Sequence, residues 1–426
     1  MDLPKIEPGR KGKIPIPKFA RLREFTGEVW MTITFRQKTA TPWAEAGFEV
    51  AWFQAQLPGA TLPRSINSAD LRNTHGTLPG HDGSAVSPLR QGADLPFPVA
   101  RPTTQLVILD NQDPAGFPPL SLQTTQSSYT ITSPSAHLTI SRSTGLLTHW
   151  SHNSRPILHS NPSHSPLLGL DFWRAPTDND YRGPDASTWK RYGLDTLTSS
   201  LRSINVAQHN SHISITTKTR IAPPILAWGF LCTTTYTISF SGSLHIHVHL
   251  KPEGPGQPRT VPHIGLLLRL EKSLQTAKWF GLGPGEAYSD KMAAQRVGIW
   301  NADVQGLETR YEVPQENGNR MCTRWLDVID ESGRGGMRVR LVSDEQAHKG
   351  EEEGKSPLFQ WQLSRYSAQM LEAAKHPCEL REDEATLLRL DVAMAGVGTG
   401  ACGPAIGEMY EVKCEEREFE FELVPL

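Results

Sequence analysis

The chain has 426 residues, enough for two or three domains with separate cores. Its formal net charge of −2 offers no basic surface for phosphate groups, so no nucleic-acid partner is expected. The 33 prolines and 35 glycines favour many short strands and turns over long helices.

The five cysteines are scattered and form no Cys-x-x-Cys pair. They predict neither a disulfide framework nor a zinc site, so we expect no metal site and a reducing compartment. The first 18 residues carry four prolines and lack the apolar core of a signal peptide. The most apolar stretch, residues 264–270, is too short to cross a bilayer. A cytoplasmic protein without a membrane partner is therefore expected.

Residues 1–57 predict part of a β-sandwich. Residues 28–36 alternate between polar and apolar side chains, as a half-buried strand does, and residues 48–57 form a second strand candidate. Two strands cannot bury both faces of a sandwich, so we expect this piece to be completed by an upstream segment or by another chain.

Residues 58–118 are rich in Pro, Gly, Ser and Asn and show little periodicity. They predict a linker or insertion, in which residues 105–109 are the one strand candidate.

From residue 119 onward, strand-like segments follow one another, separated by turns such as Ser143-Thr144-Gly145. Few stretches show a helical period, and residues 368–374 are the best candidate. The pattern predicts one large all-β sandwich over residues 119–426. The expected strands are residues 128–132, 136–141, 211–217, 233–240, 243–250, 264–270, 337–341 and 416–424.

Four short motifs carry a resemblance to a known family. They are residues 172–180 (FWRAPTDND), 279–291 (WFGLGPGEAYSDK), 314–318 (PQENG) and 363–367 (LSRYS). Their order and spacing resemble the C-terminal, small-chain region of family-2, lacZ-type β-galactosidases. The opening piece, with WAEAG at 43–47, resembles the end of the immunoglobulin-like domain that precedes this region.

The resemblance implies a large antiparallel β-supersandwich of the galactose-mutarotase type that packs on a catalytic (β/α)8 barrel and forms the rim of its sugar pocket. The rim residues it implies are Asp180, Tyr181, Arg182, Gly400 and Cys402. Many bacterial members have a tryptophan where this chain has Cys402, which resembles the yeast-type members. Without the indole ring, a stacking platform for the aglycone is missing.

The residues that would cleave the sugar do not occur in the chain. Retaining β-galactosidases need two carboxylates about 5–5.5 Å apart. In this family the acid/base glutamate follows an asparagine, but no Asn-Glu dipeptide occurs here, and neither Cys-Glu pair matches the nucleophile motif. The resemblance therefore implies no catalytic residue in this chain, and magnesium and sodium sites that lie upstream. The partners it implies are a β-galactoside and the barrel-containing portion, joined in an oligomer.

A histidine-rich strand and two glycine-rich stretches could also be binding sites. His245, His247 and His249 share one face of a strand and could chelate a metal, but a polar outer face is the simpler interpretation. The glycine-rich stretches 281–285 and 396–400 are better interpreted as turns than as phosphate-binding loops.

The 172–180 motif and the chain as a whole also allow alternative interpretations. Arg174, Asp178 and Asp180 could be a sugar site, but a buried turn network is favoured. A stand-alone carbohydrate-binding or mutarotase-like module would need a His acid and a Glu base in one cleft, for which only His263 is available. A nonfunctional remnant would expose strand edges.

Overall fold

The computed structural model of the chain describes residues 6–7, 9–13, 28–57, 120–159, 166–344, 357–399, 401 and 405–426. The chain divides into two compact units, residues 1–109 and 110–426. Residues 58–118, with the strand expected at 105–109, lie outside the described residues, and so do Gly400 and Cys402. The predicted domain boundaries at 57 and 119 stay predictions.

The first unit contains a two-stranded antiparallel sheet, which confirms both strands expected there. It pairs β1 (Val29–Arg36) with β2 (Glu49–Leu57). Of the apolar side chains in this sheet, Met31 is buried, whereas Val50 is 60% exposed. The described part of this unit thus buries one side of the hairpin better than the other.

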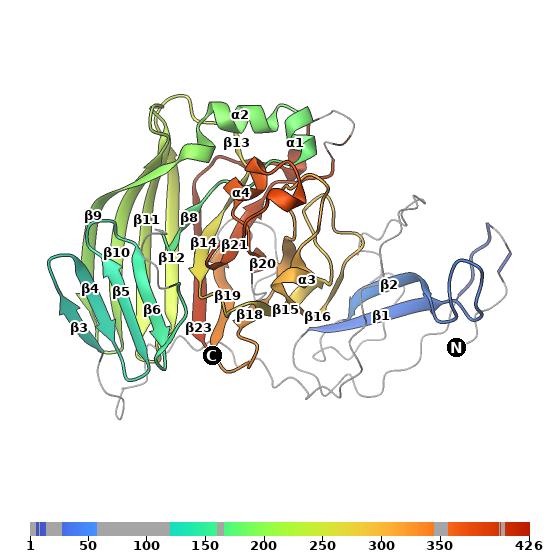
Figure 1. Cartoon of the computed structure of the whole chain (residues 1–426), viewed down its shortest axis with the longest axis horizontal. Helices are drawn as coiled ribbons and strands as arrows, with labels where there is room; N and C mark the ends of the chain where they lie inside the picture. Colours follow the sequence, from blue (N-terminus) through green and yellow to red (C-terminus); the bar gives the residue numbers. More distant parts are fainter. Residues whose placement is uncertain are drawn as a thin grey trace. The chain divides into compact units, whose positions relative to one another are not determined.

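The described part of the second unit is built on a nine-stranded antiparallel sheet with the order β16-β15-β18-β19-β23-β12-β11-β10-β9 (Figure 1). The last strand of the chain, β23, lies between β12 and β19 and so joins the two halves of this sheet. Its strands are β9 (Thr198–Gln208), β10 (His212–Ala222), β11 (Gly229–Ser239), β12 (Leu244–Glu253), β15 (Thr276–Gly283), β16 (Arg296–Asp303), β18 (Trp325–Ile329), β19 (Gly336–Asp344) and β23 (Arg417–Pro425).

Two five-stranded antiparallel sheets and a two-stranded sheet complete the unit, with the orders β17-β20-β21-β14-β8, β3-β4-β5-β6-β7 and β13-β22. Their strands are β3 (Ser121–Thr124), β4 (Ser128–Thr132), β5 (Ala136–Ser141), β6 (Leu147–His152), β7 (Arg155–Pro156), β8 (Leu168–Asp171), β13 (Thr260–Val261), β14 (His263–Leu270), β17 (Arg320–Thr323), β20 (Phe359–Ser364), β21 (Thr386–Met394) and β22 (Val412–Lys413). The expected all-β, antiparallel supersandwich is confirmed.

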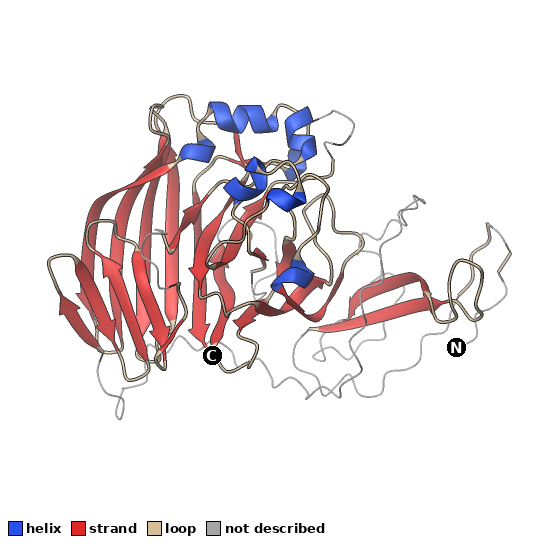
Figure 2. Ribbon diagram, viewed as in Figure 1, coloured by secondary structure: helices blue, strands red, loops and turns tan. Residues whose placement is uncertain are grey.

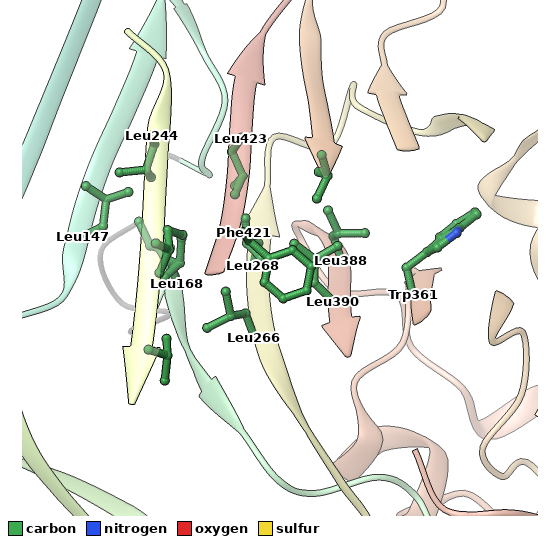
Figure 3. Packing of buried hydrophobic residues seen from close by; sticks show 14 of the residues in the cluster. Leu147, Leu168, Leu244, Leu266, Leu268, Trp361, Leu388, Leu390, Phe421 and Leu423 are labelled. Atoms are coloured by element: carbon green, nitrogen blue, oxygen red, sulfur yellow. The ribbon is translucent and has the colours of Figure 1, made fainter. Parts of the chain in front are cut away.

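One continuous apolar core lies between these sheets. Strand alternation supplies it, since Leu244, Ile246 and Val248 on β12 are each 0% exposed. Figure 3 shows Leu266 and Leu268 of β14 beside Phe421 of β23, in contact across the layers. Burying a side chain of this size contributes roughly 1.5–3 kcal/mol, so the core dominates the stability of the unit.

Helices α1 (Asp178–Arg182), α2 (Asp185–Arg191) and α4 (Ala368–Ala373) gather at one end of the sandwich, toward the top of the view in Figure 2, whereas α3 (Val304–Leu307) lies lower, directly after β16. The expected helix at 368–374 is confirmed as α4, and Ser367 caps it by accepting a hydrogen bond from Met370 N. No helix among the described residues is long and apolar enough to cross a membrane. The 3-10 turns are η2 (Leu194–Thr196), η3 (Pro377–Glu379) and η4 (Glu408–Tyr410).

Candidate functional site

Helix α1 begins in a capping box. Thr177 N and Thr177 Oγ1 donate to Asp180 Oδ2 at 2.7 and 2.9 Å, and Asp180 N donates back to Thr177 Oγ1 at 3.3 Å. This reciprocal arrangement satisfies backbone donors that the start of a helix leaves without partners. It fixes where the short helix starts and which way Tyr181 and Arg182 emerge from it.

A buried ion pair ties α1 to the strand end at residues 395–396. Arg174 Nη2 donates to both Asp180 oxygens at 2.9 and 3.0 Å, and both side chains are 0% exposed. The same guanidinium donates to Ala395 O at 3.3 Å and to Gly396 O at 3.2 Å. Arg174 therefore holds two segments more than 200 residues apart in the sequence.

Asp290 holds the next residues of the 395–399 segment. Its carboxylate accepts hydrogen bonds from Val397 N at 2.9 Å, from Gly398 N at 2.8 Å, and from Thr399 N and Oγ1 at 2.8 and 3.0 Å. Burial raises the pKa of Asp290, but the backbone hydrogen bonds outweigh it and leave that pKa below its usual value. A Cβ at Gly396 would lie 2.5 Å from Asp290 Oδ2, so this approach requires glycine.

Tyr181 leans on α4. Its hydroxyl donates to Glu372 Oε1 at 3.4 Å, and Trp173 Nε1 donates to Glu372 Oε2 at 3.1 Å. Lys190 forms an ion pair with the same carboxylate and lies over the Tyr181 ring. Tyr181 is nevertheless 53% exposed, so one face of its ring is free to meet a partner.

The PQENG motif contacts α1 from another side. Asp178 N donates to Gln315 Oε1 at 3.1 Å, and Gln315 Nε2 donates back to Asp178 Oδ2 at 3.3 Å. The adjacent Glu316 is buried in a bidentate ion pair with Arg389, at 2.6 and 3.0 Å. The motif thus joins the helical end to the sandwich interior.

The WFGLGPGEAYSDK motif is joined to PQENG by Glu286, which accepts a hydrogen bond from Gly318 N at 2.8 Å and from Tyr311 Oη at 2.5 Å. Lys291 also pairs with this carboxylate. Burial raises the pKa of Glu286, but these donors more than offset burial and hold the pKa below its usual value. All four sequence motifs therefore meet at the helical end, LSRYS through the Ser367 cap of α4.

The structure separates the predicted rim residues into two kinds. Asp180 is buried with both oxygens occupied, so it supports α1 from inside, whereas Tyr181 and Arg182 are exposed. Gly400 and Cys402 lie outside the described residues, and the rim as a whole stays a prediction. Arg174 and Asp180 form the favoured buried turn network, whereas Asp178 is exposed and contacts Gln315. Asp290 and Glu372 were not predicted; Asp290 stands in a quoted motif, but nothing in the letters shows its partners.

The other candidates have structural partners. His245 and His247 hydrogen-bond glutamates of β23, His249 hydrogen-bonds Glu416 just before that strand, and no metal-binding cluster is found among the described residues. His263 is 0% exposed, with Nδ1 2.8 Å from Asp391 Oδ1. It does not reach an open cleft with a glutamate, so the described residues provide no mutarotase-like acid–base pair around it.

An antiparallel supersandwich whose signature motifs interlock at one helical end defines a domain of the β-galactosidase small-chain type. The family described as "Beta galactosidase small chain" matches residues 132–424, and "Beta-galactosidase, domain 4" matches residues 1–58. The chain belongs to the β-galactosidase small-chain family.

Individual relatives support this family assignment. A β-galactosidase of Kluyveromyces lactis is 32% identical over 257 residues, which cover 60% of this chain and 23% of the relative. This agrees with the predicted yeast-type resemblance. A "Beta-galactosidase 2" of Enterobacter cloacae is 26% identical over 412 residues, covering 94% of this chain and 32% of the relative. The chain thus spans about a quarter to a third of the length of these curated relatives.

Among solved structures, a galactose 1-epimerase from Lactobacillus acidophilus matches with a TM-score of 0.38 and 7% identity, over 72% of this chain and 98% of that chain.

Proposed function

We propose that this chain is the C-terminal, small-chain component of a β-galactosidase that hydrolyses terminal β-D-galactosides such as lactose, and that it shapes the rim of the sugar pocket. One observation carries this: the four family motifs interlock at the helical end, where Arg174 and Asp290 hold the 395–399 segment beside the exposed Tyr181. Burying these charged side chains costs desolvation free energy. In return, their hydrogen bonds hold the surrounding surface in one geometry, as a binding site requires.

In this proposal the chain has no activity alone, because the acid/base and nucleophile glutamates belong to a barrel-containing portion. That portion also supplies the magnesium and sodium sites. The chain associates with it in an oligomer in the cytoplasm. The lack of any Asn-Glu dipeptide supports this division of labour.

The rim assignment is tested by steady-state kinetics on the chain assembled with the barrel-containing portion from its source organism. We expect Tyr181→Ala to raise KM for a β-galactoside about fivefold, which corresponds to roughly 1 kcal/mol of binding, with a smaller change in kcat. Arg182→Ala should act in the same direction. Ile299→Ala on β16, also an exposed site, is the control and should leave KM unchanged.

Two outcomes would contradict the rim assignment. One is an unchanged KM in Tyr181→Ala and Arg182→Ala together. The other is an equal KM increase in Ile299→Ala, which would point to a general effect on assembly.

Cys402 offers a separate test of the rim. Cys402→Trp should supply the missing stacking platform and lower KM for an aryl β-galactoside more than for lactose, because an aryl aglycone stacks on an indole. An equal effect on both substrates would place residue 402 away from the aglycone.

A further inference from the structure

A second candidate site lies inside the sandwich. A cavity of about 680 Å³ is lined by β9, β10 and β11 of the nine-stranded sheet, by β8 and the residues after it, by Leu266 of β14 and by the turn at 143–146. This volume lies within the range of small-molecule pockets, roughly 300–1,000 Å³. None of Asp180, Tyr181, Arg182 or residues 395–399 lines it.

The wall on the large sheet carries hydroxyl groups at positions that would ordinarily be aliphatic. Thr217 of β10 and Thr234 of β11 are directly opposite in the antiparallel register, face the cavity, and are 2% and 7% exposed. Thr219 and Tyr236, also buried, line the same wall. Elsewhere on β10 the inward-facing positions are aliphatic, as at Ile213 and Ile215. The inward-facing polar side chains are therefore those at the cavity.

The opposite wall supplies a carboxylate and aromatic surface. Asp171 is oriented by Trp173 N, which donates to Asp171 Oδ1 at 3.3 Å, while Asp171 Oδ2 lies 3.6 Å from His263 Nε2. That His263 nitrogen is buried and makes no hydrogen bond to any described residue. Phe172 and Trp173 add apolar rings to the lining.

The charge of the lining selects against anions. Asp171 and Asp195 are its charged side chains, and no lysine or arginine is among the described residues around the cavity. An anionic ligand would lose its hydration without gaining a cation. A hydroxyl group, by contrast, can donate to a carboxylate and both donate to and accept from threonine hydroxyls.

We propose that this cavity is a binding site for a neutral, polyhydroxylated small molecule of monosaccharide size, separate from the rim of the galactose pocket. Buried hydroxyls and the Asp171 carboxylate would bond the hydroxyl groups, and the aromatic rings would cover the apolar faces of the ligand. The site belongs to this chain alone and does not depend on assembly with a barrel.

Isothermal titration calorimetry on the full chain tests the site with three probes of similar size: D-galactose, myo-inositol and the anion D-galacturonate. We expect measurable binding of at least one neutral probe and none of galacturonate at the same concentration. Thr217→Val and Thr234→Val, which keep the side-chain shape, should each weaken the neutral probe about five- to tenfold, since each loses about one buried hydrogen bond. Asp171→Asn should weaken it as well.

Thr233→Val is the matched control, because it makes the same change on the opposite face of β11 and should leave binding unchanged. A thermal melt of each variant confirms that the fold is retained. The proposal is overturned if no neutral probe binds at tens of millimolar, if galacturonate binds equally well, or if Thr233→Val weakens binding as much as Thr217→Val and Thr234→Val do. These results bear only on the cavity, because no barrel-containing portion is present.

Discussion

At the scale of single residues, the Arg174–Asp180 pair is the most consequential contact at the helical end. Both side chains are fully buried, and Arg174 also serves two main-chain carbonyls. Two charges can be kept out of water here because each compensates the other and Arg174 Nη1 and Nη2 have acceptors, although the buried Arg174 Nε has no hydrogen-bond partner among the described residues.

Removing one partner of the Arg174–Asp180 ion pair should therefore strongly lower the free energy of unfolding. Asp180→Ala leaves a buried, uncompensated guanidinium, and we expect the free energy of unfolding to fall by about 3–5 kcal/mol in urea denaturation. The double variant Arg174→Met with Asp180→Leu should be less destabilised than Asp180→Ala. Glu382→Gln, which removes the exposed ion pair with Lys272, serves as the control and should change little. If Asp180→Ala matched this control, the pair would not hold the helical end together.

Asp290 gives a pH-dependent prediction. Its pKa is lowered in the folded chain, so its contribution is fully present above the usual carboxyl pKa and is lost as pH falls through the lowered folded value. We expect Asp290→Asn to reduce the free energy of unfolding by about 1.5 kcal/mol at pH 7, with the difference shrinking below pH 4. Urea denaturation across this range checks it. A difference independent of pH would show that the carboxylate charge is not what holds the 395–399 segment.

The sequence identified these residues only in part. Asp180 could be named because it stands in a family motif, and the turn network was the favoured interpretation of that motif. Asp290 and Glu372 were not assigned roles, because their partners lie more than 100 residues away and no local pattern reports such a contact. The burial of Asp180 could not be predicted either, because it depends on contacts with residues that are distant in the sequence.

At the scale of elements, the outer face of β12 forms a ladder with β23 and with Glu416, the residue just before that strand. His245 Nδ1 lies 3.0 Å from Glu420, His247 Nε2 2.7 Å from Glu418, and His249 Nε2 2.7 Å from Glu416. Each of these hydrogen bonds runs to the diagonal residue of the antiparallel register, and His245 Nε2 also lies 3.6 Å from the directly opposite Glu422. The regular spacing that suggests metal chelation thus serves strand pairing.

The ladder makes stability depend on pH near neutrality. The hydrogen bond to Glu420 raises the pKa of His245, so the stabilisation is present below its usual value of 6.5 and is lost as pH rises through the raised folded value. We expect His245→Gln to cost roughly 0.5–1 kcal/mol at pH 6 and nothing measurable at pH 9. Urea denaturation at both pH values measures this. His376→Gln, at an exposed turn, is the control, and a pH-independent effect of His245→Gln would refute the ladder's role.

Strand prediction succeeded where alternation is strong. The expected strand at 128–132 coincides with β4, and that at 264–270 lies within β14. The polar edge strand β9 was missed because no buried face imposes a period of two on its sequence. Helix α1 was missed because five residues are too few to show a helical period.

At the scale of the whole molecule, the all-β class followed from composition and repeated alternation, but the strand order did not. Strand β23 pairs with β12, about 170 residues earlier in the chain, and with β19 on its other side. Such pairings depend on which apolar faces fit together in three dimensions, and sequence spacing does not encode that fit. Family membership and the interlocked motifs at the helical end are the observations from which we propose a pocket-rim role for this chain.

We propose that this chain contributes to galactoside hydrolysis only together with a barrel-containing portion. The direct measurement is turnover of a chromogenic β-galactoside by the chain, by the barrel-containing portion from the same source, and by their mixture. We predict no turnover by the chain, little by the other portion, and restored turnover in the mixture, saturating as the chain is added. Robust turnover by the chain alone, or a mixture no more active than the sum of its parts, would contradict the account.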